Sequence, residues 1–127
     1  MVEGDTLNTE INDINKLQFS SLLSKKGILL VLSPNFLGKS FIIDSRRLII
    51  GRGNGCDFII KDPLISKEHC RITIDENEKF FIEDLLSTNS TFINGKELKK
   101  KTQLAYGDRI TMGKTILRFF LEEKSEN

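Results

Sequence analysis

Short apolar segments alternate with turn residues from residue 27 to residue 122 of the chain. The segments are rich in β-branched residues, and Ile72 and Ile74 alternate with polar neighbours, as expected for a strand with one buried face. Many short strands with no helix-period segments between them predict an all-β sandwich or barrel. The expected strands are residues 27–33, 40–44, 47–51, 57–60, 69–75, 79–84, 90–94, 108–112 and 114–122.

One turn is specific enough to predict its backbone geometry. Asn94 and Gly95 separate the apolar pair Phe92-Ile93 from residues 96–98. Asn-Gly is a preferred pair for a two-residue type I′ turn, because both positions need a positive φ. The sequence therefore predicts a tight hairpin at residues 94–95.

Residues 1–26 follow a different pattern. Apolar side chains at approximately helical spacing, with no Gly or Pro in residues 5–26, predict a short amphipathic helix there; they are Leu7, Ile11, Ile14, Leu17 and Leu22. This extension is either a frayed tail or helix lying on the sandwich, or a helix that contacts a partner or a second copy of the chain. Residues 123–127 are polar and predict a tail or linker stub, which leaves residues 27–122 as the domain.

Charge and hydropathy narrow the class of partner. The 127 residues suffice for one domain with its own core. The 19 basic residues nearly balance the 18 acidic ones, so the basic excess of a nucleic-acid binder is missing, and the lysine run 99–101 is more typical of a solvated turn than of a binding patch. No apolar run approaches the ~18 residues of a membrane helix, and the acidic N-terminus does not resemble a secretory signal. We expect a cytoplasmic protein that binds neither nucleic acid nor membrane.

Cysteine and histidine offer little for metal binding. Cys56, Cys70 and His69 are the only residues of these types, and their spacing matches no metal motif. We expect two buried thiols in a reducing compartment, and no metal or other cofactor.

Two local patterns suggest catalysis or nucleotide binding but lack the remaining requirements. The glycines of Gly51-x-Gly53-x-Gly55 do not have the GxGxxG spacing, and a strand follows them instead of a helix. Ser66 and His69 lie three residues apart, with no nucleophile elbow and no third member of a triad. The sequence therefore predicts a protein that is not an enzyme.

Four segments, taken together and in this order, resemble the forkhead-associated (FHA) domain family: residues 49–52 (IIGR), 66–69 (SKEH), 87–95 (STNSTFING) and 104–110 (LAYGDRI). The resemblance covers residues 27–122 and implies an FHA-type β-sandwich of about 11 short, mostly antiparallel strands. It also implies a module that binds phosphothreonine peptides in signalling, often as one part of a longer bacterial protein.

The resemblance implies a role for five polar residues. Arg52 and the hydroxyl of Ser66 bind the phosphate, and Lys67 takes the place of an auxiliary phosphate contact. Thr88 contacts the phosphate or the threonine methyl group, and the side chain of Asn89 holds the backbone of the bound peptide.

Four further residues are implied to support the site structurally: Gly51, His69, Asn94 and Gly95. The chemistry of the ligand fits the polar set, since a phosphothreonine carries about −1.5 to −2 charge and three acceptor oxygens. A guanidinium with hydroxyl and backbone donors matches it. Arg52, Ser66 and the Thr88-Asn89 pair each follow an expected strand, where loops of a sandwich can converge on a ligand.

Two positions depart from the family pattern. Ser90 stands where glycine is usual, and at a positive φ it costs about 1 kcal/mol of strain. Lys67 stands where arginine or asparagine is common, which keeps a cation but loses the planar fork of arginine. A second function also stays open: an FHA scaffold that binds an unphosphorylated partner, or dimerises, through the sandwich surface or residues 1–26.

Overall fold

The computed structural model describes residues 24–123, so the helix predicted in the N-terminal extension and the polar tail lie outside the described residues. The described chain contains 11 strands and one short 3-10 helix, Pro34–Phe36. The strands are β1 (Lys25–Val31), β2 (Ser40–Ile43), β3 (Arg47–Gly51), β4 (Phe58–Ile59), β5 (Cys70–Ile74), β6 (Phe80–Asp84), β7 (Thr91–Ile93), β8 (Lys96–Glu97), β9 (Thr102–Gln103), β10 (Arg109–Met112) and β11 (Thr115–Glu123).

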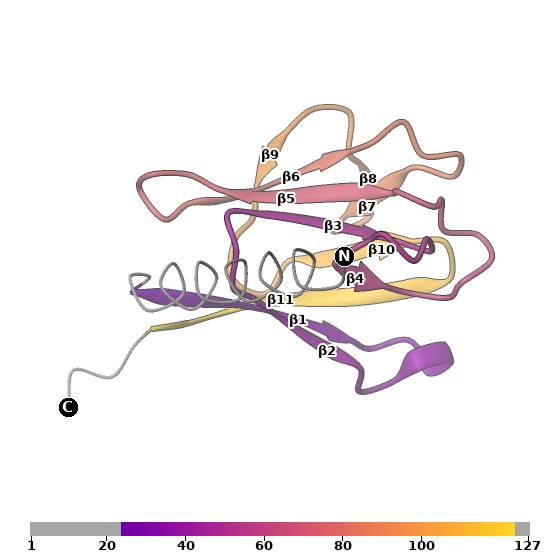
Figure 1. The fold of residues 1–127 in the computed structure, drawn as a ribbon, viewed down its shortest axis with the longest axis horizontal. Coiled ribbons are helices and arrows are strands. Elements are labelled where there is room, and N and C mark those ends of the chain that lie inside the picture. Colours follow the sequence, from indigo (N-terminus) through magenta and orange to yellow (C-terminus); the bar gives the residue numbers. More distant parts are fainter. Residues whose placement is uncertain (1–23, 124–127) are drawn as a thin grey trace, which may run out of the picture.

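The strands form two sheets that pack as a sandwich (Figure 1). One sheet has the order β2-β1-β11-β10-β7-β8, and the other has the order β4-β3-β5-β6-β9. Every pair is antiparallel except β3 with β4, which is parallel. The all-β sandwich of mostly antiparallel strands predicted from the sequence is confirmed.

The core lies between the two sheets because one face of most strands is apolar. In β5, Cys70, Ile72 and Ile74 are buried, and the intervening Arg71 and Thr73 are only half-buried. Burying such side chains stabilises the fold by roughly 1.5–3 kcal/mol each. The largest fully buried side chains are Phe58, Phe80, Phe119, Leu29, Ile43, Leu48, Ile50, Ile60, Ile65, Ile72, Ile82 and Ile110.

The predicted hairpin at residues 94–95 is confirmed. Asn94 has a φ of 51° and Gly95 a φ of 84°, and Ile93 pairs directly with Lys96 across the turn. The side chain of Asn94 donates from Nδ2 to Asp108 at 2.9 Å, and its Oδ1 accepts from the amide of Arg109 at 2.9 Å. The turn therefore also fixes the start of β10.

The strand limits differ from the expected ones mainly at the edges of the sheets. β9 has two residues and was not predicted, because Thr102 and Gln103 carry no apolar pattern and only their pairing with Ile82 and Phe81 makes them a strand. β1 begins at Lys25 and β11 ends at Glu123, slightly beyond the predicted domain limits of 27–122. Within residues 24–123, no helix has the length and apolar character needed to span a membrane.

Candidate functional site

Arg52 directly follows β3, in the loop that leads to β4. Its backbone amide donates to the carbonyl of Ser66 at 2.9 Å, and its side-chain Nε donates to the carbonyl of Ile65 at 3.0 Å. The side chain is half-buried. Among the described residues, no carboxylate pairs with this guanidinium and no hydrogen bond involves its Nη atoms, so its outer edge can receive an anion.

Gly51 and Gly53 let the β4–β5 loop approach the end of β3. A Cβ on Gly51 would lie 2.2 Å from the carbonyl oxygen of Lys67, closer than any side chain can come. That carbonyl also accepts hydrogen bonds from the amide of Gly53 at 3.0 Å and from the thiol of Cys56 at 2.8 Å. The close packing places Ser66 and Lys67 beside Arg52.

His69 is completely buried, lies directly before β5 and joins two loops. Its Nδ1 accepts a hydrogen bond from the amide of Ser66 at 3.0 Å, and its Nε2 lies 2.9 Å from the carbonyl oxygen of Ser90. The histidine thus links the β4–β5 loop to the β6–β7 loop, a bracing contact of the kind that the family resemblance implies.

The β6–β7 loop brings Thr88 and Asn89 to the same place. The amide of Thr88 donates to the hydroxyl oxygen of Ser66 at 3.1 Å, and Nδ2 of Asn89 donates to the carbonyl of Leu64 at 2.9 Å. Both side chains are exposed. Ser66 accepts the Thr88 amide, so the hydrogen of its own hydroxyl group remains to donate to a ligand.

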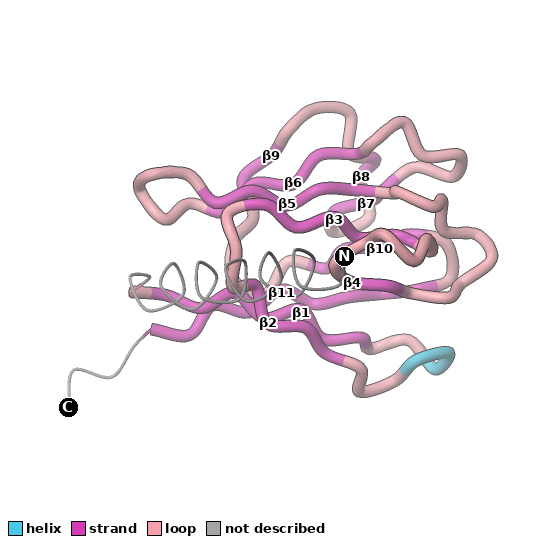
Figure 2. The backbone as a smooth tube through the Cα atoms, in the orientation of Figure 1, coloured by secondary structure: helices cyan, strands magenta, loops and turns pink. Residues whose placement is uncertain are grey.

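Of the five polar residues expected at the site, the described bonds join Arg52, Ser66 and Thr88 directly. Lys67 is exposed beside Ser66, and Asn89 bridges to the adjacent Leu64. Figure 2 shows the three connecting loops, β3–β4, β4–β5 and β6–β7, at one end of the sandwich. Asn94 and Gly95 lie apart from these loops, in the β7–β8 turn.

Ser90 adopts a φ of 65°, in the left-handed region. This is the conformation for which the sequence predicts strain of about 1 kcal/mol in a serine. Its hydroxyl donates to Oε1 of Glu97 at 2.9 Å, and its carbonyl faces His69. Two contacts therefore hold the strained residue in place.

Three residues that organise the site were not predicted from the sequence, and Lys61 is the first of them. Its Nζ donates to the carbonyl of Arg52 at 2.9 Å and to Oδ1 of Asn54 at 2.8 Å. It therefore fixes the loop behind Arg52 and adds a positive charge there. A lone lysine on the strand side of an Asp-Pro turn gives no signal of this role in the sequence.

Asp62 is the second missed residue, a buried carboxylate that accepts from the amide of Leu64 at 2.9 Å, the amide of Lys114 at 2.7 Å and the hydroxyl of Thr115 at 2.9 Å. Burial alone would raise the pKa of Asp62, but these hydrogen bonds outweigh it and lower the pKa below its ordinary value. The Asp62-Pro63 pair signalled only a turn, whereas the carboxylate anchors the β4–β5 loop to the β10–β11 turn.

Asp84 is the third missed residue and lies at the end of β6. Its Oδ2 accepts from the amide of Ser87 at 3.0 Å, and its Oδ1 accepts from the hydroxyl of Thr91 at 2.7 Å. Burial opposes its ionisation, yet the hydrogen bonds of Ser87 and Thr91 outweigh burial and lower its pKa. Asp84 thereby closes the base of the loop that carries Thr88 and Asn89.

The two thiols are buried, as expected. Burial raises the pKa of Cys56, which donates its hydrogen to the Lys67 carbonyl, and it raises the pKa of the fully buried Cys70 further. Within residues 24–123, no three side chains of the His, Cys, Asp or Glu type gather as metal ligands do. Arg52, Lys61 and Lys67 thus supply three cations beside hydroxyl and amide groups, an arrangement that suits a bound anion attached to a peptide.

Comparison with known proteins agrees with this geometry. A family model described as FHA domain matches residues 48–113. The chain is 37% identical over 75 residues to the human proliferation marker protein Ki-67, covering 59% of the chain and 2% of that protein. It is 34% identical over 86 residues to the oxoglutarate dehydrogenase inhibitor of Corynebacterium efficiens, covering 68% of the chain and 58% of that protein.

Solved structures show the same architecture. The chain aligns with a solved FHA domain studied for phosphothreonine-dependent interactions, with a TM-score of 0.71 and 27% identity, covering 78% of the chain and 99% of that domain. The chain spans only a small part of the human relative and little more than half of the bacterial one.

Proposed function

Since the chain belongs to the forkhead-associated (FHA) domain family, we propose that it is a phosphothreonine-reading module, which docks a partner protein that a threonine kinase has marked. The observation that carries the proposal is the environment of the Arg52 guanidinium. This guanidinium is fixed through Nε to the Ile65 carbonyl and faces no carboxylate within the described chain, and the backbone amide of Arg52 bonds the carbonyl of Ser66.

Each of the five polar residues has a role that its geometry supports. Arg52 supplies charge-assisted hydrogen bonds to the phosphate, and Lys67 adds a second cation at the exposed side. The Ser66 hydroxyl donates its own hydrogen to a phosphate oxygen. Thr88 borders the phosphothreonine, and Asn89 presents its amide oxygen, which accepts no bond among the described residues, to the backbone of the peptide.

The second interpretation, a scaffold for an unphosphorylated partner, leaves the guanidinium of Arg52 without a role. An arginine with free Nη atoms at the end of a strand can be replaced at little loss if it serves only a solvated turn. The phosphate reader, in contrast, depends on it. The two proposals therefore differ in what Arg52 contributes.

The test is a calorimetric titration with phosphorylated and unphosphorylated versions of one peptide selected from a phosphothreonine library. The reader binds only the phosphorylated version, with micromolar affinity, on the order of −8 kcal/mol. Arg52→Ala weakens this binding at least about 30-fold. Equal affinity for the two peptides, or for wild type and Arg52→Ala, would contradict phosphate reading and favour the scaffold.

A further inference from the structure

A groove of about 500 Å³ opens where the edges of the two sheets meet, beside β8 and β9. β8 is the last strand of one sheet and β9 the last strand of the other. No strand covers the core on this side within the described chain, so the interior is reached between the two edges. None of the five polar residues of the candidate phosphate site lines this groove.

The floor of the groove is apolar and its rim is positively charged. Leu98, only 7% exposed, and the half-buried Ile93 form the floor, while Lys96, Lys99 and Lys100 are exposed around it. None of these three lysines forms an ion pair within residues 24–123. An anionic ligand with an apolar side chain would complement both parts of the groove.

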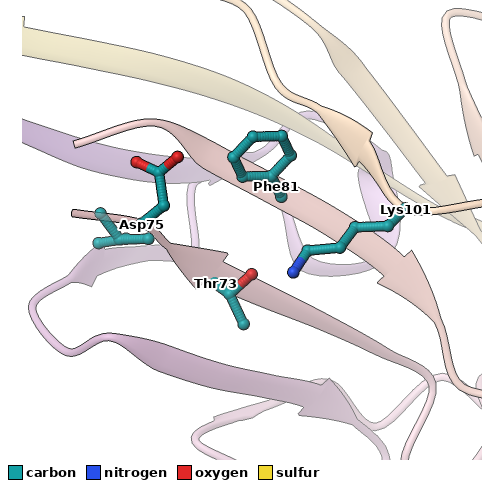
Figure 3. Close-up of a pocket in the computed structure, with 5 residues that line it drawn as sticks. Thr73, Asp75, Phe81 and Lys101 are labelled. Carbon is teal, nitrogen blue, oxygen red and sulfur yellow. The ribbon is translucent and has the colours of Figure 1, made fainter. Parts of the chain in front are cut away.

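The remaining charged side chains of residues 96–101 are those of Glu97 and Lys101. Glu97 also lines the groove and accepts the hydroxyl of Ser90, and its single negative charge is outnumbered by the three lysines. Lys101 turns to the outer face of the other sheet, where its Nζ lies 5.6 Å from the centre of the Phe81 ring. Figure 3 shows Lys101 there, lining a separate hollow with Thr73, Asp75 and Phe81. The positive rim of the groove therefore consists of Lys96, Lys99 and Lys100.

The groove adjoins the candidate phosphate site. Ser90 directly follows Asn89, and its hydroxyl bonds Glu97 of β8 at 2.9 Å. One residue further, the amide of Leu98 donates to the carbonyl of Thr91 at 2.7 Å. Lys99 and Lys100 thus leave β8 alongside the loop that carries Thr88 and Asn89, so one extended peptide can reach both places.

We propose that this groove docks an acidic segment of the phosphorylated partner, contiguous with the phosphothreonine and carrying one apolar side chain that enters between Ile93 and Leu98. The proposal rests on the proposed function, because it extends the same peptide. The three lysines favour an acidic segment, and the position of the groove beside the candidate phosphate site favours a segment of the same peptide. A nucleic acid is less suitable, since the floor is aliphatic and no aromatic side chain offers a base to stack on.

The experiment compares phosphothreonine peptides that share one neutral core. Two peptides carry an extension of five residues, four acidic and one leucine, placed before the core in one peptide and after it in the other. Two matched peptides have the same extensions with each acidic residue replaced by its amide. Wild type should bind one acidic peptide about three- to tenfold more tightly than its amide match, as expected for a few exposed ion pairs. The gain should shrink as salt rises, because exposed charges are screened.

The variant Lys99→Gln/Lys100→Gln should lose this gain while it keeps the affinity for the core peptide. The matched control, Lys26→Gln/Lys79→Gln, removes two exposed lysines from β1 and the β5–β6 turn and should keep the gain. The groove assignment is overturned if neither acidic extension strengthens binding, or if the Lys99/Lys100 variant retains the gain. An oligonucleotide that binds wild type equally tightly, with the same dependence on Lys99 and Lys100, would also overturn it.

Failure of the proposed function has a different signature. In that case no peptide binds in a phosphate-dependent way, and the acidic segment is titrated alone against protein with labelled Ile and Leu methyl groups. Shifts of the Ile93 and Leu98 methyl signals in wild type that are lost in Lys99→Gln/Lys100→Gln would support the groove. Unchanged Ile93 and Leu98 signals in wild type would refute it.

Discussion

Nδ1 of His69 accepts the backbone amide of Ser66 at 3.0 Å, while the opposite ring nitrogen faces the Ser90 carbonyl oxygen at 2.9 Å. A carbonyl only accepts, so Nε2 carries the hydrogen and the ring is the neutral Nε2–H tautomer. One buried ring thereby sets the position of Ser66, whose hydroxyl we propose binds the phosphate, relative to the β6–β7 loop. These two bonds support a structural role for His69, although it lies three residues from Ser66.

Replacing this ring should weaken both fold and binding. His69→Phe keeps most of the volume but leaves the Ser66 amide and the Ser90 carbonyl without partners, which we expect to lower the free energy of unfolding by about 2–4 kcal/mol. Chemical denaturation measures this change. Ser66→Ala is the matched comparison, because it keeps the backbone bond to His69 and should mainly reduce phosphopeptide affinity. Equal stability of His69→Phe and wild type would refute the bracing role.

Removal of the main phosphate partner should be the most damaging change to binding. Arg52→Ala is expected to reduce phosphopeptide binding by about 2–5 kcal/mol, at least about 30-fold, because the phosphate loses its charge-assisted hydrogen bonds. Arg47→Ala, at the other end of β3 and exposed, is the control and should leave the affinity unchanged. Titration calorimetry on both variants separates the specific loss from a general loss of positive charge.

Gly51 should tolerate no side chain. Gly51→Ala places a Cβ 2.2 Å from the backbone oxygen of Lys67, so the β4–β5 loop must move. We expect a loss of about 1–3 kcal/mol or more in stability, together with weaker phosphopeptide binding. Gly55→Ala is the control, since a Cβ there meets no atom within 4 Å. Similar stability of the two variants would show that the loop contact is not tight.

Acid should destabilise the protein partly through Asp62. Its folded pKa is lowered by its three hydrogen bonds against the opposing effect of burial. A lowered folded pKa gives stability that is present above the unfolded pKa, about 3.9, and is lost as pH falls through the folded value. Asp62→Asn should therefore lower stability at neutral pH by about 1–3 kcal/mol and flatten its decline below about pH 4.

Unfolding curves measured from pH 7 to pH 2 test this expectation. Asp84, the other carboxylate with a lowered pKa, still contributes to the acid decline in wild type and in Asp62→Asn. If the stability of Asp62→Asn falls with decreasing pH as steeply as that of wild type, Asp62 does not contribute to the acid destabilisation.

Phosphopeptide affinity should depend on pH through the ligand itself. The phosphate of phosphothreonine takes up its second proton near pH 6, so its charge and its attraction to Arg52 fall below that pH. We expect affinity to decline from about pH 6.5 to pH 5 in step with the free peptide, as followed by phosphorus NMR. Constant affinity across this range would exclude the dianion as the bound form.

The sequence predicts the sandwich because alternation and turn residues are local signals. The hairpin at Asn94 and Gly95 is the clearest case, since two adjacent residues determine the turn. β9 was missed because Thr102 and Gln103 become a strand only by pairing with β6. An edge strand of two polar residues has no pattern of its own to detect.

The candidate site likewise has residues that the sequence predicts and supporting contacts that it does not. Arg52, Ser66, Thr88 and Asn89 are expected from motifs, and the strain at Ser90 is expected because glycine is usual at this position of the family pattern. The supporting contacts are not predictable, because their partners are far apart in sequence: Asp62 bonds residues 114 and 115, and the Asn89 side chain bonds Leu64. Such contacts follow from the packing of the two sheets, which no local pattern describes.

The bonds that join Thr88 to Ser66 and Asn89 to Leu64 are made by the protein alone. The receiving surface is consequently preorganised, and the entropy of ordering its loops is spent during folding and not during recognition. The peptide contributes most of the remaining ordering. Rigid loops also favour fast association and rapid release at micromolar affinity, so a reader of this kind can follow the loss of its mark as promptly as its appearance.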